Sequence, residues 1–165
     1  MQNRNHFFVN PFKACAALAV FLFLTVISVC LVTIREYIGA AVFFVVGLLF
    51  VPPILQYGRV VTTDSNGVSA AFLGRIMLKF SWNELAEVGI AGSRVFGSRD
   101  GKKPGTLYLY FSPSVMTEKE KFDMILKFPP KDKIVLICDT YSYGAVRKYW
   151  HGTIKNYNAK DTPFD

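Results

Sequence analysis

Residues 14–34 decide the fold and read ACAALAVFLFLTVISVCLVTI, an apolar stretch interrupted only by two threonines and one serine. A second apolar stretch, YIGAAVFFVVGLLFVPPILQY, covers residues 37–57. A helix needs roughly 20 apolar residues to cross the hydrocarbon core of a bilayer, which is about 30 Å thick. The sequence therefore predicts a transmembrane hairpin of two helices, preceded by a short N-terminal tail, within residues 1–57.

The second apolar stretch contains residues that shape its helix. Proline removes a backbone donor and clashes with the preceding turn, so we expect a kink or an end near Pro52 and Pro53. Gly39 and Gly47 lie on a similar face, and small residues let two helices approach closely in a membrane. A cleaved signal peptide is the alternative for the first stretch, but the apolar core of such a peptide is usually only about 7–15 residues long.

Positive charge is distributed unevenly around the hairpin. Arg4 and Lys13 precede the first helix, and the turn between the helices holds only Arg35 and Glu36. Three basic residues follow the second helix: Arg59, Arg75 and Lys79. Because lysine and arginine are enriched in cytoplasmic flanks, we expect both termini in the cytoplasm and a minimal turn on the other side of the cell membrane.

The whole chain is basic. Its 165 residues carry a formal net charge of +7. Positive charge beside a bilayer attracts anionic head groups by about 1 kcal/mol for each well-placed residue, although it also aids solubility. The basic residues are scattered and accompany no nucleic-acid motif, so nucleic acid is not an expected partner. The cysteines lie in apolar stretches and predict no disulfide framework: Cys15, Cys30 and Cys138.

Residues 58–165 have the pattern of a soluble, mostly β domain. The dipeptide Asn66-Gly67 between two apolar runs is a strong hairpin signal. Residues 91–105 are rich in glycine and basic residues and predict a long connection. Short β-prone runs predict the strands, which cover residues 59–63, 68–73, 76–80 with a continuation to 90, 106–111 and 134–138.

Two helices are predicted in the last third of the chain. Thr117 and Glu120 have the spacing of a capping box, which opens a short helix from 118 to about 126. The apolar residues of 141–158 fall near one face and predict a second helix packed on the sheet. The expected fold class is α+β: a transmembrane helical hairpin followed by a small β sandwich or open barrel with a C-terminal α-helix over one end.

Two motifs resemble the bacterial pleckstrin-homology-like (PH-like) family of small membrane proteins. TDSNGV at 63–68 is similar to the family's Thr-x-x-Gly-Ile hairpin, and FSWNELAEV at 80–88 is similar to its Ile-x-Trp-x-Glu-Ile-x-x-Val strand. The stretch from Tyr141 to Trp150 resembles the family's closing helix. The resemblance covers residues 57–158 and implies a non-catalytic module that commonly follows a pair of transmembrane helices.

The ionisable residues give little support to an enzyme. Cys138 and His151 could be imagined as a nucleophile and its base, but Cys138 lies in an apolar run without a basic neighbour, so a packed thiol is expected. Glu84 and Glu87 would point to opposite faces of a strand, so we expect a solvated carboxylate rather than an acid–base pair. No catalytic residue, metal site or cofactor is predicted, and the two tryptophans are expected to anchor the core.

The candidate ligand contacts are all basic. By the resemblance, loops between strands at the open end of such a fold often meet anionic ligands, and here the long connection carries Arg94, Arg99, Lys102 and Lys103. A solvated loop is the alternative, with other candidate lipid contacts at Arg59, Arg75 and Lys79. We expect a membrane-anchored, non-catalytic binding or scaffolding module at the cytoplasmic face, with lipids and a protein as partners. The alternative function is an accessory or regulatory subunit that pairs with a transporter or signalling complex through the hairpin.

Overall fold

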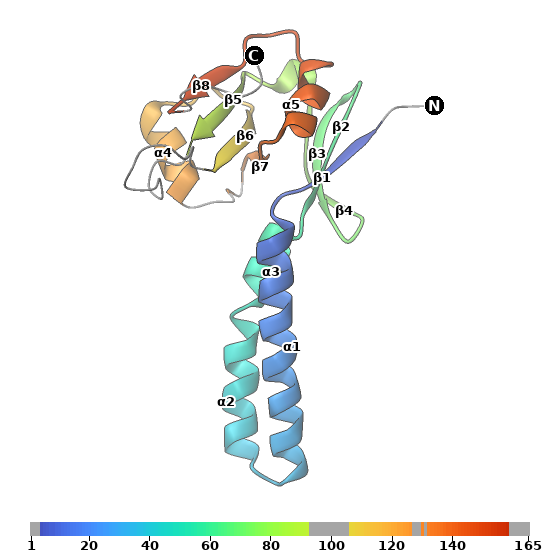
Figure 1. Ribbon diagram of the computed structural model, residues 1–165, viewed down its shortest axis with the longest axis vertical. Coiled ribbons are helices and arrows are strands. Elements are labelled where there is room, and N and C mark those ends of the chain that lie inside the picture. Colours follow the sequence, from blue (N-terminus) through green and yellow to red (C-terminus); the bar gives the residue numbers. More distant parts are fainter. Residues whose placement is uncertain (1–3, 93–105, 127–129, 131, 159–165) are drawn as a thin grey trace. The chain divides into compact units, whose positions relative to one another are not determined.

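The computed structural model describes residues 4–92, 106–126, 130 and 132–158 (Figure 1). The chain divides into two compact units. Residues Asn10–Arg59 form one unit, called here the helical hairpin. Residues Met1–Val9 and Val60–Asp165 together form the other, called here the β domain. The fold class is α+β, with two long apolar helices and open sheets, as the sequence predicts at this level.

The helical hairpin consists of α1 (Pro11–Thr33), α2 (Tyr37–Leu48) and α3 (Val51–Tyr57). The stretches Pro11–Thr33 and Tyr37–Tyr57 are each long and apolar enough to cross a membrane. The Asn10 side chain caps α1 by accepting from the Lys13 amide at 3.1 Å. At the base of the hairpin, the Asn10 amide donates to the Tyr57 carbonyl at 3.2 Å, so its two ends are held together.

The second apolar stretch is interrupted just before its prolines, as predicted. The amides of Leu49 and Phe50 donate to carbonyls only three residues back, at 3.1 and 3.0 Å. Pro52 and Pro53 then occupy the start of α3. Proline lacks the N–H that would continue α2, and it is tolerated in a first helical turn, where no such donor is needed.

The two glycines of α2 face α1. A Cβ at Gly39 would lie 3.4 Å from Leu31 Cδ1, and one at Gly47 would lie 3.6 Å from Leu24 Cβ. Between them, the Ser28 hydroxyl donates to the Ala40 carbonyl at 2.8 Å. The close approach that the glycines predict is therefore confirmed, and Figure 1 shows α1 and α2 side by side. A hydroxyl bonded to a backbone carbonyl satisfies both groups where water is absent.

The first sheet of the β domain is antiparallel, in the order β1-β2-β3-β4. Its strands are β1 (Asn5–Phe8), β2 (Val60–Asp64), β3 (Gly67–Phe72) and β4 (Arg75–Ser81). The predicted Asn-Gly hairpin joins β2 to β3, and Asp64 Oδ1 accepts from the amides of Asn66 and Gly67 at 2.8 and 3.2 Å. One face of this sheet is buried, so its side chains alternate between core and solvent.

Strand β1 was not foreseen. The sequence predicts a tail over residues 1–13, but β1 pairs with β2 along its whole length, with Phe8 opposite Val60. The next residue, Val9, is 2% exposed and belongs to the core. The helical hairpin is therefore inserted between two adjacent strands of one sheet. A four-residue strand beside a long apolar helix leaves little periodicity to detect.

The second sheet has the order β7-β6-β5-β8. Its strands are β5 (Glu87–Gly92), β6 (Leu107–Ser112), β7 (Ile134–Ile137) and β8 (Lys155–Tyr157), and only the β5–β8 pair is parallel. One face packs on the first sheet through Ile90, Leu109 and Phe111. Met124 from α4 (Glu118–Leu126) packs with side chains of the other face. Burial on both faces explains why β5 is buried at every residue.

The stretch between the sheets departs from the prediction. A continuous strand from residue 76 to 90 is wrong, because a 3-10 turn, η1 (Trp82–Glu84), separates β4 from β5. The Ser81 amide donates to Glu84 Oε2 at 2.7 Å and closes a capping box. The predicted capping box at Thr117 and Glu120 is confirmed, since the Thr117 amide donates to Glu120 Oε2 at 2.8 Å just before α4.

The C-terminal helix is much shorter than the predicted 141–158. Helix α5 spans Thr140–Arg147, and β8 follows it. The Trp150 amide still donates to the Val146 carbonyl at 2.8 Å. The Trp150 ring then packs against the core and against Trp82, with ring centroids 6.3 Å apart. A Cβ at Gly152 would lie 2.7 Å from that ring, so the glycine lets the chain turn past Trp150 toward β8.

Candidate functional site

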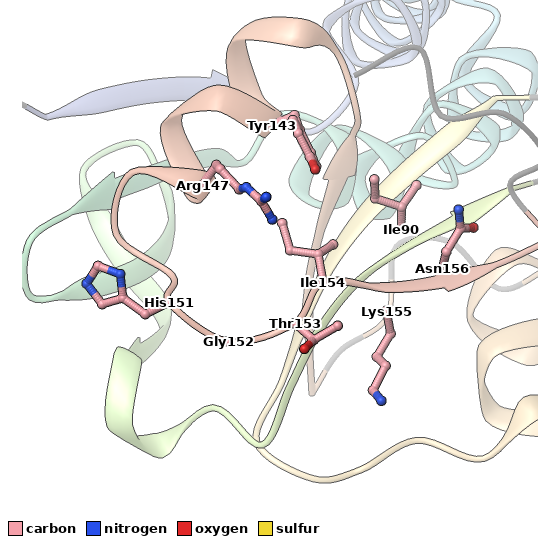
Figure 2. Close-up of a pocket in the computed structure, with 9 residues that line it drawn as sticks. All are labelled: Ile90, Tyr143, Arg147, His151, Gly152, Thr153, Ile154, Lys155 and Asn156. Carbon is pink, nitrogen blue, oxygen red and sulfur yellow. The ribbon is translucent and has the colours of Figure 1, made fainter. Parts of the chain in front are cut away.

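A pocket of about 390 Å³ lies in the β domain between α5 and β8. Tyr143 and Arg147 come from α5, and residues 151–156 supply most of the remaining wall. Figure 2 shows the Arg147 guanidinium and the Tyr143 ring reaching from α5 toward Ile154. Pockets that hold small ligands have volumes of roughly 300–1,000 Å³, so this pocket is large enough for a small molecule.

The pocket is polar and positively charged. Arg147 and Lys155 are cationic, and no carboxylate lines the pocket within the described residues. Thr153 adds a hydroxyl and Asn156 an amide. Arginine binds planar anions such as phosphates or carboxylates through paired N–H groups. The chemistry of the lining therefore suits a small anion.

The floor of the pocket is fixed by the fold. Ile90 is 2% exposed and comes from β5. It is paired with Asn156 across the parallel β5–β8 ladder. On the α5 side, the Asp139 and Ser142 side chains form a capping box, with the Ser142 amide donating to Asp139 Oδ1 at 2.7 Å. One wall is thus held by the strand ladder and the other by a helix cap, which favours a preformed site over one assembled on binding.

The described basic residues that were expected to bind a ligand do not line this pocket. The predicted contacts of the long connection, Arg94, Arg99, Lys102 and Lys103, lie outside the described residues. Arg59 is buried, and burial lowers the pKa of its guanidinium. Arg75 and Lys79 are exposed on β4. The structure brings none of these three to the pocket between α5 and β8.

The prediction that Glu87 is solvated is wrong. Its carboxylate is buried, with a 2.7 Å ion pair to Lys121 of α4 and a 2.5 Å hydrogen bond from the Tyr110 hydroxyl. The Met116 amide donates to the other oxygen at 2.9 Å. A Cβ at Gly89 would overlap the Tyr110 hydroxyl, so the missing side chain makes room for this bond.

The protonation of this cluster follows from its contacts. Burial by itself raises the pKa of Glu87, but the hydrogen bonds from Lys121, Tyr110 and Met116 bring that pKa below its ordinary value. Burial, together with the carboxylate, raises the pKa of Tyr110. The contacts of Glu87 join β5 to Tyr110 of β6, to Met116 and to Lys121 of α4, and so hold α4 against the second sheet. We therefore interpret the cluster as structural.

The candidate nucleophile Cys138 is also packed in the core, whereas its imagined base, His151, is exposed at the pocket. Cys138 is buried, and burial together with Asp139 raises the pKa of its thiol to about 12. A thiol with so high a pKa is a poor nucleophile at neutral pH. Within the part of the chain that the structure describes, no three His, Cys, Asp or Glu residues are grouped so that they could hold a metal ion.

Comparisons with family models, with curated proteins and with solved structures found no match to this chain.

Sequence reasoning missed the pocket because it placed residues 151–156 in a helix. One signal was present: Gly152 followed by the β-branched residues Thr153 and Ile154. Glycine ends helices, and β-branched residues favour strands. The two tryptophans, by contrast, behave as predicted. Both pack against the core, and the Trp82 indole also donates to the Asp64 carbonyl at 2.8 Å.

Proposed function

We propose that this chain is a membrane-anchored, non-catalytic binding module, in which the helical hairpin crosses the bilayer and the β domain is PH-like and cytoplasmic. The observation that carries the proposal is the place of the hairpin in the chain, between β1 and β2, which pair with each other. The anchor is thus part of the connection between two paired strands and not an appended tail. Such an arrangement ties the binding domain to the membrane at two points of its own sheet.

The strand order supports the PH-like part of the proposal. Four antiparallel strands, β1 to β4, are followed by the antiparallel strands β5 to β7 and then by α5. Antiparallel strands followed by a C-terminal helix are the pattern that the sequence predicts for this domain, although β1 lies outside residues 57–158, to which the resemblance extends. Helix α4 and strand β8 are additions to that pattern.

The surface of the hairpin supports a membrane anchor. The glycines of α2 contact α1. Large apolar side chains on other faces are exposed, among them Phe23, Val26 and Val45. Bulky aliphatic and aromatic residues suit contact with lipid tails, whereas in water they would cost free energy.

Cysteine labelling tests the anchor and its orientation. We expect a membrane-impermeant thiol reagent to modify Glu36→Cys in intact cells, and to modify Asn66→Cys only after the cells are permeabilised. Glu36 lies in the turn of the hairpin and Asn66 in the exposed turn between β2 and β3. Replacing an acid at the turn disturbs orientation little, because orientation follows lysine and arginine. Modification of Asn66→Cys in intact cells would reverse the proposed topology.

The pocket gives the module a ligand class. Arg147 is the cation that reaches into it (Figure 2). With the full chain in neutral phosphatidylcholine nanodiscs, we expect inorganic pyrophosphate to change the tryptophan fluorescence saturably, because Trp150 lies against Gly152 of the pocket wall. Arg147→Ala should weaken this binding about tenfold, the typical effect of losing one charge-assisted hydrogen bond.

A neighbouring residue provides the control. Lys148 carries the same charge and is also exposed, but it lies over the Tyr149 ring and does not line the pocket. Lys148→Ala should therefore leave the affinity for pyrophosphate nearly unchanged. Equal weakening by the two substitutions would show that pyrophosphate responds only to overall charge, and would remove the pocket from the proposal.

A further inference from the structure

The turn between β3 and β4 presents apolar side chains to solvent. Leu73 is 90% exposed, Ile76 59% and Met77 48%. Large apolar residues scattered singly are common on protein surfaces, but a cluster on one projecting turn indicates an interaction site.

The backbone of this turn makes the choice of leucine unusual. Phe72 pairs with Arg75, so Leu73 and Gly74 are the two central residues of a tight hairpin. Their φ angles are +47° and +80°, which is the pattern of a type I′ turn. Asparagine, aspartate and glycine are the residues favoured there. A leucine gains nothing from this conformation and exposes its side chain fully, so its presence calls for a reason outside the isolated fold.

The register shows at which end of the strands of the first sheet this turn lies. Phe8 pairs with Val60, Val60 with Ala71, and Ala71 with Ile76. The chain enters α1 just after Phe8 and leaves α3 just before Val60. The β3–β4 turn therefore lies at the same end of the first sheet as the points where the chain enters and leaves the helical hairpin. At the opposite end of the strands, the turn between β2 and β3 is polar and reads Asp64-Ser65-Asn66-Gly67.

The charges beside the turn are positive. Residues 65–83 contain Arg75 and Lys79 and no acidic residue. Both side chains are exposed. Basic residues that flank exposed apolar ones suit the surface of a membrane with anionic head groups, where the apolar side chains enter the acyl boundary and the cations stay among the phosphates.

We propose that the β3–β4 turn inserts Leu73, Ile76 and Met77 into the interface of an anionic membrane leaflet, the same leaflet at which the helical hairpin begins and ends. The inference rests on the proposed function, since it requires that the hairpin cross that membrane. The turn then forms a third attachment of the β domain to the lipid surface, after the two chain connections, and limits rotation of the first sheet about them.

Spin labels on the full chain test this contact. In a Cys15→Ala/Cys30→Ala background, Met77→Cys carries the label at the β3–β4 turn, and Asn66→Cys carries it at the opposite end of the sheet. The native Cys138 is buried and stays unmodified. Proteins are reconstituted in phosphatidylcholine vesicles with or without phosphatidylglycerol. Collision rates of each label with oxygen, which concentrates in lipid, and with a water-soluble nickel chelate are then compared. The Cys15→Ala chain labelled at Cys30, within α1, serves as the lipid reference.

The inference expects the label at residue 77 to favour oxygen, as the Cys30 label does, and the label at residue 66 to favour the nickel chelate. Leu73→Asn, which suits the positive φ, should remove the oxygen preference at residue 77 without unfolding the turn. The oxygen preference at residue 77 should increase when phosphatidylglycerol is present, and Arg75→Gln/Lys79→Gln should remove that increase. Equal nickel access at 77 and 66 with a lipid-like Cys30 overturns this inference alone. A water-like Cys30 overturns the proposed membrane anchor itself.

Discussion

Removal of residues 1–9 is expected to abolish the cooperative unfolding of the β domain, although these residues precede the first apolar helix. The deletion takes away β1 and with it Phe7 and Val9, which pack in the core shared by both sheets. The burial of these two side chains contributes about 3 kcal/mol, and the ladder between β1 and β2 is lost as well. The total stability of a domain is only about 5–15 kcal/mol.

Urea titration of the full chain in detergent micelles measures this effect. The only two tryptophans, Trp82 and Trp150, pack against the core of the β domain, so their fluorescence reports on that domain. Val9→Asp should reproduce the deletion, because it buries an unpaired charge. Phe8→Ser, at a 58% exposed neighbour, should leave the urea midpoint nearly unchanged. If Val9→Asp and Phe8→Ser unfolded at the same urea concentration, β1 would not belong to the core.

Glu87→Gln is the second substitution with a large expected effect. It leaves the Lys121 ammonium, only 13% exposed, without its anion. Loss of one partner from a buried ion pair costs about 3 kcal/mol or more, which should lower the urea midpoint strongly in the same fluorescence assay. Lys121→Met in addition removes the unpaired charge, so the double variant should be more stable than Glu87→Gln alone. If the double variant lost as much stability as Glu87→Gln and Lys121→Met alone lose together, that result would contradict the ion-pair explanation.

The same carboxylate predicts a dependence of stability on pH. Its pKa in the folded chain lies below its ordinary value of 4.5, so the folded state holds the proton less tightly than the unfolded state. Its stabilising contribution is complete above that ordinary value and is lost as the pH falls through the folded-state pKa. Glu87→Gln should flatten this acid-side loss. Glu118→Gln, at an exposed position in the first turn of α4, should change it much less.

The sequence indicates those parts of the fold whose physics is local. Apolar length predicts the two long helices, Asn66-Gly67 predicts the hairpin between β2 and β3, and Thr117 with Glu120 predicts the start of α4. Each signal acts within a few residues or along one continuous stretch. The prolines, likewise, interrupt the second apolar stretch through their own backbone chemistry.

The missed features depend on contacts between distant residues. Strand β1 exists because residues 60–63 lie beside it, on the far side of an apolar hairpin in the sequence. Glu87 is buried because Lys121 and Tyr110 meet it from other elements. The pocket forms because Trp150 turns inward onto Trp82, which ends the helical path and brings β8 to β5. No local pattern reports such partners, so the candidate site was found only in the structure.

The insertion of the hairpin between β1 and β2 has a consequence for the order of assembly. During synthesis β1 emerges first, but its partner β2 emerges only after both apolar helices are complete. Closing a loop of this length in a disordered chain costs on the order of 3 kcal/mol in entropy. Pairing of α1 with α2, together with the Asn10–Tyr57 hydrogen bond between the start of α1 and the end of α3, brings the two ends of this loop together and so reduces that entropy cost. The sheet therefore closes more readily on a hairpin that is already formed, and in a chain with mispaired helices β1 is more often unpaired and exposed to proteolysis.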